Sequence, residues 1–242
     1  MSQTKSNAEP LRIDVVSDVV CPWCFIGKRR LEKALASKPS IPVEVRFRPY
    51  FLNPWVPREG ISREDYLTTK FGSVDKYKGI AARVAAAAAS EGLTYAVDKI
   101  KRQPNTLDCH RLILWAGQKG PDGGAARMKQ RLMDLYFTAG GDLTDTNVLV
   151  QAAVDCGLDG DEVRKLLACD QDAALIEQEA NAAKEAGIDG VPTFIFGGVA
   201  AVSGAQAPEM LARAIEQIAT NRDQFLAQQR AANRRTPVQF FF

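Results

Sequence analysis

The chain has 242 residues, of which 46% are hydrophobic and 25% are charged, and its formal net charge is +2. These values are ordinary for a globular protein, and the near-neutral charge argues against nucleic acid, which usually requires a concentrated basic face. No apolar run approaches the roughly 18 residues of a membrane span, and residues 1–16 contain no apolar segment of a secretory signal. We therefore expect a cytoplasmic protein with no nucleic-acid and no membrane partner, in which a structural disulfide is disfavoured.

The N-terminal part of the chain predicts a strand, a helix and a second strand. Residues 11–17 alternate between apolar and mostly polar side chains, and so do residues 43–48. Between them, the apolar spacing after Cys21 becomes helical and predicts a helix to about residue 37. A strand–helix–strand unit of this kind makes its two strands parallel through a right-handed crossover.

The middle of the chain, residues 62–187, predicts helices and no convincing strand. The sequence SRED at residue 62 has the form of a capping box, and Ser73 can cap a long helix that ends at Gly92. Further helices are predicted over residues 106–118, 125–138, 146–155, 161–168 and 172–186.

Strands return near the C-terminal end. Residues 193–196 and 199–202 are short apolar runs separated by two glycines, which predicts a hairpin, and residues 207–219 predict an amphipathic helix. The element order indicates an α/β fold interrupted by a large all-helical insertion. We predict a discontinuous α/β domain of residues 11–60 and 188–220, an inserted helical domain of residues 61–187 and a C-terminal tail of residues 221–242.

The tail ends in three aromatic residues, Phe240, Phe241 and Phe242. Either they belong to a frayed terminus, or they dock on an apolar surface of this chain or of a second copy in a homodimer.

Two cysteines, Cys21 and Cys24, enclose Pro22 and Trp23. A structural zinc site needs four ligands, but the chain has no second pair of this spacing and a single histidine, so we expect no metal. A structural disulfide between the two would close only a small loop and stabilise little.

A redox role fits the local pattern better. Proline is favoured at the first helical position, which puts Cys21 at the N-cap of the predicted helix. The unpaired N–H groups and partial positive charge there stabilise a thiolate. Cys24 lies one turn further and can resolve a mixed disulfide.

The motifs SDVVCPWCFIGK, NTLDCHRLILWA and GVPTFIFGG together resemble the DsbA family of thioredoxin-fold proteins, and within it the FrnE-like branch. That branch is similar to 2-hydroxychromene-2-carboxylate isomerases and kappa-class glutathione transferases. The resemblance implies a thioredoxin-like fold, Cys21 as nucleophile and Cys24 as resolving thiol. It also implies that Val191 and Pro192, followed by Thr193, form a cis-proline element that binds substrate backbone. From the residues alone, Pro192 in an ordinary turn is the alternative.

Two departures from the related branches bear on the reaction. The isomerases and transferases are expected to carry serine where this chain has Cys21, and serine cannot form a disulfide. They also use a Ser-Asp pair for glutathione where this chain has Gly204 and Ala205. Both departures favour thiol–disulfide exchange over tight glutathione binding.

Several other residues are candidates for the site. His110 is either a core residue or lies near the cleft and tunes Cys21. Asn53 belongs to a loop that either packs internally or forms an apolar lip of the substrate groove. Asp18 either caps or braces the loop before Cys21, or it exchanges a proton with Cys24. Asp14 is a rival for the second role, and the sequence does not distinguish the two carboxylates.

We therefore predict a thiol–disulfide oxidoreductase that acts on protein or small-molecule disulfides and thiols. It needs no tightly bound cofactor, and glutathione is a candidate co-substrate. The alternatives are a glutathione-dependent isomerase or transferase on the same scaffold, and a chaperone-like module that binds apolar peptides.

Overall fold

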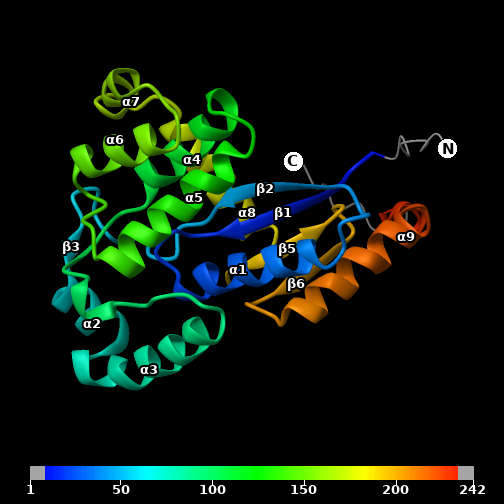
Figure 1. Ribbon diagram of the computed structural model, residues 1–242, viewed down its shortest axis with the longest axis horizontal. Helices are drawn as coiled ribbons and strands as arrows, with labels where there is room; N and C mark the ends of the chain where they lie inside the picture. The colour runs from blue at the N-terminus through cyan, green and yellow to red at the C-terminus, as the bar shows by residue number, and fades with distance from the viewer. Residues whose placement is uncertain (1–8, 234–242) are drawn as a thin grey trace.

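The computed structural model describes residues 9–233. Its main sheet has four strands in the order β2-β1-β5-β6 (Figure 1). The bounds are β1 (Leu11–Ser17), β2 (Val43–Pro49), β5 (Thr193–Phe196) and β6 (Ala200–Ser203). β1 and β2 are parallel, whereas β5 runs antiparallel to both β1 and β6. The predicted crossover and hairpin are therefore confirmed, and they share one sheet.

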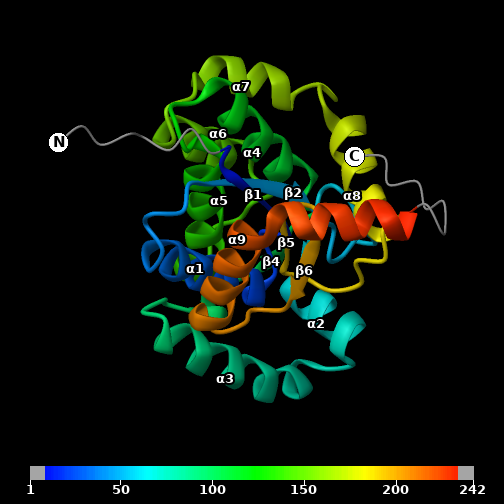
Figure 2. The ribbon, with the colours of Figure 1, turned by 90° about the vertical axis from the view of Figure 1, so that its right-hand side faces the viewer.

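Each face of the sheet has its own helical cover. Leu11, Ile13 and Val15 are buried on one face, against α1 (Pro22–Ala36) and α9 (Pro208–Asn233). These two helices pack beside each other (Figure 2). On the opposite face, Val16 packs against Ala183 of α8 (Ala173–Glu185). The alternation of side chains along β1 thus sorts its residues between two separate clusters.

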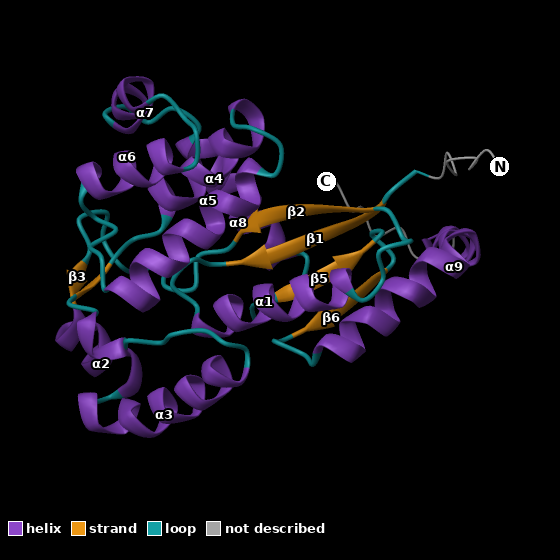
Figure 3. Ribbon diagram, viewed as in Figure 1, coloured by secondary structure: helices purple, strands orange, loops and turns teal. Residues whose placement is uncertain are grey.

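The segment between β2 and β5 is mainly helical (Figure 3). Its helices are α2 (Arg63–Phe71), α3 (Val74–Ser90), α4 (Leu107–Lys119), α5 (Gly124–Asp134), α6 (Thr146–Asp155), α7 (Gly160–Leu167) and α8. The side chains of Ser62 and Ser73 cap α2 and α3 as predicted. The α/β fold with a large helical insertion is confirmed.

The expectation that this segment has no strand was wrong. β3 (Ile61–Ser62) pairs antiparallel with β4 (Arg102–Gln103) in a separate small sheet. Each strand has only two residues, so no alternation of apolar and polar side chains exists to reveal it. α5 also ends earlier than predicted, because a π-helical turn, Leu135–Ala139, follows it.

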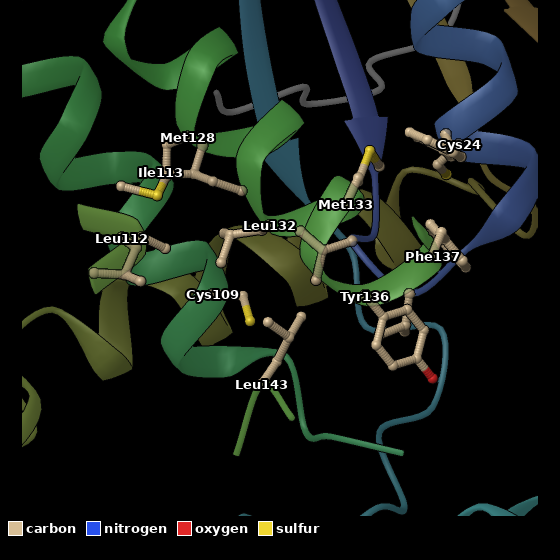
Figure 4. Close-up of a cluster of buried hydrophobic side chains, with 14 of the residues drawn as sticks. Cys24, Cys109, Leu112, Ile113, Met128, Leu132, Met133, Tyr136, Phe137 and Leu143 are labelled. Atoms are coloured by element: carbon tan, nitrogen blue, oxygen red, sulfur yellow. The ribbon is translucent and has the colours of Figure 1, made fainter. Parts of the chain in front are cut away.

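The inserted helices share a core with the start of α1. Cys24 lies in the same buried cluster as Met133 and Phe137 of the insertion (Figure 4). The rings of Phe25 and Phe137 stack with their centroids 5.2 Å apart. Because the core is continuous, the division of the chain at residues 60/61 and 187/188 stays a prediction.

The C-terminal helix is longer than the apolar pattern indicates. α9 continues to Asn233, with a non-helical backbone conformation at Asn221, so residues 222–233 of the predicted tail are helical. Phe240, Phe241 and Phe242 lie outside the described residues. Within residues 9–233, no helix has both the length and the apolar character that crossing a bilayer requires.

One glycine of α1 allows the loop before β5 to approach the helix closely. A Cβ atom on Gly27 would lie 2.8 Å from Cγ of Pro192 and 3.3 Å from Cζ of Phe194. A larger side chain would therefore push the two segments apart. Gly79 in α3 provides a matched position, because a Cβ there would meet nothing within 4 Å.

We expect Gly27→Ala to lower the free energy of unfolding by about 1–3 kcal/mol, because it overpacks this contact. Gly79→Ala should instead raise it by about 0.5–1 kcal/mol, because alanine is the better helix former in open space. Urea unfolding of both variants measures the difference. If both variants changed the free energy of unfolding in the same direction and by the same amount, the contact of Gly27 with Pro192 would not be tight.

Candidate active site

Cys21 occupies the N-cap of α1, as the sequence predicts. Its backbone is extended, and Pro22 follows at the first position of the helix. The carbonyl oxygen of Cys21 accepts hydrogen bonds from the N–H groups of Cys24 and Phe25, at 3.0 and 3.1 Å. Both cysteines are free thiols and buried, Cys21 with 3% and Cys24 with 2% of its surface exposed. The strand-to-helix turn thus presents Cys21 at the helix N-terminus with Cys24 one turn behind it.

The two thiols differ in acidity. A hydrogen bond from the Cys24 thiol lowers the pKa of Cys21 below its ordinary value, although burial opposes this, and the N–H groups of Cys24 and Trp23 also lower it. Burial raises the pKa of Cys24 well above its ordinary value, and its interaction with Cys21 raises it further. Cys21 is therefore the thiol that ionises first, and Cys24 keeps its proton.

The loop before β5 contacts Cys21. The Cys21 thiol lies 3.6 Å from the carbonyl oxygen of Val191 and donates to it. The peptide bond between Val191 and Pro192 is cis. Thr193 begins β5, is buried, and donates from its hydroxyl to the carbonyl oxygen of Gly190 at 2.8 Å. Residues that are far apart in the sequence thus meet at one end of the sheet.

Asp18 is the carboxylate next to the cysteines. It is fully buried, and its two oxygens accept hydrogen bonds from the N–H groups of Val19, at 2.7 Å, and Leu52, at 2.8 Å. Burial alone would raise the pKa of Asp18, but His110, the N–H of Leu52 and Lys129 together hold it below its ordinary value. The carboxylate is therefore ionised at neutral pH.

The rival carboxylate has a different environment. Asp14 forms ion pairs with Arg12, at 2.8 Å, and with Arg48, at 2.9 Å. The structure thus places Asp14 in ion pairs on the sheet and Asp18 on the loop that leads to Cys21, and the role of Asp18 in proton transfer stays a prediction.

His110 of α4 is buried, with 4% of its surface exposed. Its Nε2 atom lies 3.4 Å from Oδ1 of Asp18 but has no hydrogen-bond partner of good geometry. The ring meets Phe51 edge-on, with 5.8 Å between the centroids. Burial lowers the pKa of His110 below its ordinary value, although Asp18 opposes this. His110 is therefore a neutral residue beside Asp18 rather than a group that faces an open cleft.

Lys129 was not among the predicted site residues. It lies on α5 with 1% of its surface exposed, and its Nζ donates to the carbonyl oxygen of Ser17 at 3.2 Å. A signal exists in the sequence, because Lys129 has helical spacing to Leu132 and Met133 and thus falls on an apolar face. The pattern does not show what this face covers.

Asn53 is buried, with 6% of its surface exposed. Its side-chain oxygen accepts a hydrogen bond from Nζ of Lys70, on α2. A pocket of about 230 Å³ opens beside it, lined also by Phe51, Leu107 and Asn181. The sequence predicted a role for Asn53 but gave no indication of its lysine partner.

Two tryptophans are exposed in this part of the chain. Trp23, between the cysteines, has 40% of its surface exposed, and Trp55 has 45%. The ring of Trp55 stacks on Tyr66 of α2, with 6.0 Å between the centroids. Among residues 9–233, no three side chains of the His, Cys, Asp and Glu types lie together.

The buried histidine predicts a loss of stability in mild acid. Because His110 has a lower pKa in the folded state than the ordinary value of about 6.5, only the unfolded chain binds a proton between these two values. Stability therefore falls as the pH falls through this window, by up to about 1.4 kcal/mol per pH unit. The chain has a single histidine, so His110→Gln should remove this dependence.

Urea unfolding of the wild type and of His110→Gln at about pH 7.5 and about pH 5.5 measures the effect. Equal losses of stability in the two proteins would show that His110 is already protonated in the folded state.

Comparison with known proteins agrees with this fold. The model of the DSBA-like thioredoxin domain matches residues 12–216. The crystal structure of a probable DsbA oxidoreductase from Streptomyces coelicolor is 31% identical, with a TM-score of 0.78, over 96% of this chain and 94% of that chain. The uncharacterized protein YwbO of Bacillus subtilis is 27% identical over 211 residues, which are 85% of this chain and 96% of that protein.

A more distant structure shares the fold alone. The cytosolic disulfide reductase DsbM from Pseudomonas aeruginosa, solved with GSH, is 16% identical with a TM-score of 0.59, over 85% of this chain and 98% of that chain. The family match covers both halves of the sheet and the helices between them. The chain therefore belongs to the DSBA-like thioredoxin domain family.

Proposed function

We propose that this protein is a thiol–disulfide oxidoreductase in which Cys21 is the nucleophile and Cys24 is the resolving thiol. The observation that carries the proposal is the placement of two free thiols one helical turn apart, with Cys21 at the N-cap of α1. The pKa of Cys21 is lowered from its ordinary value, whereas that of Cys24 is raised well above it, and this difference supports the two roles. Membership of the family supports the same chemistry.

In the reducing direction, the Cys21 thiolate attacks one sulfur of a substrate disulfide. The substrate S–S bond breaks, one substrate thiolate leaves, and a mixed disulfide forms on Cys21. Cys24 then loses its proton, for which Asp18 is the proposed acceptor, and its thiolate attacks the sulfur of Cys21. The Cys21–Cys24 disulfide forms, the second substrate thiolate leaves, and two electrons have passed to the substrate. The oxidising direction is the reverse.

The proposed substrate site surrounds Cys21. Val191, Pro192 and Thr193 would bind the backbone of an extended substrate, because the Val191 carbonyl already lies at the thiol. Pro22 and the exposed ring of Trp23 would supply apolar contact beside it. His110 would not touch the substrate; it would act on the site through Asp18, which lies next to it.

Glutathione is the proposed co-substrate, and no tightly bound cofactor is required. The DsbM relative is solved with GSH, which supports the proposal at the level of a shared fold. Lys70 supports it further. Burial lowers the pKa of its half-buried ammonium group, whereas the negative charges of Cys21 and Asp18 raise it. A cation there would attract the carboxylates of glutathione, and Asn53 would hold that cation in position. The same relative is named cytosolic, and we propose a cytoplasmic location here.

The proposed roles of the two cysteines are tested by trapping. Cys24→Ser should accumulate a mixed disulfide between Cys21 and a disulfide substrate, because the resolving thiol is missing. Its turnover in the reduction of a protein disulfide should fall at least about 100-fold, since each cycle stops at the intermediate. Mass spectrometry of the trapped species identifies the cysteine that is modified.

The matched control is Cys169→Ser, because Cys169 is an exposed free thiol on the inserted segment. It should keep wild-type turnover. Full turnover by Cys24→Ser would refute the disulfide cycle and favour a glutathione-dependent isomerase or transferase.

A second test concerns glutathione. Lys70→Met should slow the reaction of Cys21 with oxidised glutathione by about 5- to 20-fold but leave the reaction with an uncharged small disulfide within about twofold, because the lost attraction is electrostatic. Stopped-flow measurements at low and high salt separate the two effects. Equal slowing with both disulfides would show that Lys70 acts on Cys21 itself and not on the substrate.

A further inference from the structure

The helical insertion contributes a buried lysine, Lys129, near the end of β1 that leads to the cysteine pair. Lys129 has 1% of its surface exposed, so its ammonium group is removed from water. Its one hydrogen bond among the described residues is to the carbonyl oxygen of Ser17, at the end of β1. Its Nζ also lies 5.9 Å from the ring centre of Phe47 on β2. A buried ammonium group is costly unless negative charge compensates for it.

Negative charge is available on the loop that leads into α1. Asp18, next to Ser17, is ionised and buried; its oxygens accept hydrogen bonds from the N–H groups of Val19 and Leu52, and His110 lies 3.4 Å from Oδ1. Burial lowers the pKa of Lys129 below its ordinary value, and the charges of Cys24, Asp18 and Cys21, in that order, oppose this. The hydrogen bond to Ser17 places the ammonium group at the end of β1, where the chain continues through Asp18 to the cysteines of α1.

Other titratable groups around this centre come from α4, α2, the end of β2 and the π-helical turn. Burial raises the pKa of Tyr50, which follows β2, and of Tyr136 on the turn, and both interact with Asp18. α4 contributes His110, which is neutral, and Cys109, whose pKa is raised by burial. α2 contributes Lys70 and Tyr66, both of which act on or respond to Cys21. Lys70 is only half-buried and is bound to Asn53, so Lys129 is the fully buried cation among these groups.

We propose that Lys129 is a positioning residue of the redox centre, and that its ammonium group, supplied by the helical insertion, stabilises the thiolate forms of Cys21 and Cys24 and the ionised form of Asp18. The inference deepens the proposed function, on which its redox consequence rests. It also gives the insertion a chemical role, because one residue of α5 sets the reactivity of the two cysteines at the start of α1.

The role of Lys129 is clearest in the resolving step. The Cys24 thiol gives its proton to the carboxylate of Asp18, and the resulting thiolate is stabilised by the ammonium group of Lys129. The thiolate attacks the sulfur of Cys21, the Cys21–Cys24 bond forms, and the bond from Cys21 to the substrate sulfur breaks. The substrate leaves as a thiolate with the electron pair of that bond. Lys129 stays protonated throughout.

The first test is the pH dependence of alkylation at Cys21, read by mass spectrometry of the Cys21 peptide. Lys129→Met should raise the midpoint of this profile by about one pH unit, an about tenfold loss of acidity, because an opposite charge nearby favours the thiolate. Lys28→Met is the matched control, since Lys28 is also a buried lysine next to α5 but is held by Glu32 and Gln130. An unchanged midpoint in Lys129→Met, or an equal shift in Lys28→Met, would overturn the proposal.

A charge-balanced variant keeps the test decisive if Lys129→Met does not fold. Asp18→Asn alone should lower the Cys21 midpoint, because Asp18 opposes ionisation of Cys21. Adding Lys129→Met to Asp18→Asn should raise it again by about one pH unit, in a protein with neither buried charge. No difference between Asp18→Asn and the double variant would refute the role of Lys129.

A redox equilibrium with glutathione separates this inference from the proposed function. Loss of the cation destabilises the dithiol state, so Lys129→Met should favour the Cys21–Cys24 disulfide about tenfold more than the wild type does, which is about 30 mV toward reducing potentials. If the wild type forms no such disulfide, the proposed function fails, whereas the alkylation profiles still decide the role of Lys129. A wild-type disulfide with an unchanged equilibrium in Lys129→Met would overturn the inference alone.

Discussion

Placing a thiolate inside a protein requires compensation for the water that it loses, and the arrangement around Cys21 follows from this constraint. The N-terminus of α1 supplies part of the compensation through the N–H groups of the first turn and the Cys24 thiol. This position exists because β1 ends at Ser17 and Pro22 starts the helix. The site thus depends on a strand-to-helix turn that a short stretch of sequence encodes.

Segments far along the chain complete the site. The carbonyl oxygen of Val191 accepts a hydrogen bond from the protonated Cys21 thiol, and Gly27 allows the loop before β5 to pack closely on α1. The insertion contributes His110 on α4 and Lys129 on α5, both buried beside Asp18. Because its core is continuous with the start of α1, the insertion and the sheet hold the site together.

Local patterns predicted most of the fold. The alternation in β1, the N-cap at Cys21 and the two-glycine hairpin depend on neighbouring residues alone, and the structure agrees with all three. β3 and β4 were missed because a pairing of two residues leaves no periodicity. The same limit applied to the site, since the sequence could name Asp18 and Asp14 as candidates but could not distinguish them. Only tertiary packing decides which carboxylate faces the thiols and that Lys129 approaches them.

The pairing of Cys21 with Cys24 is tested most directly by equilibrating the protein in glutathione redox buffers, with differential labelling of thiols and mass mapping of each cysteine. An oxidoreductase of the proposed kind will show a single two-electron transition in which Cys21 and Cys24 become linked to each other. A midpoint near the cytosolic glutathione poise of roughly −220 to −320 mV would let the pair exchange electrons in either direction. A protein in which Cys24 stays reduced while Cys21 binds or carries glutathione would contradict the disulfide cycle.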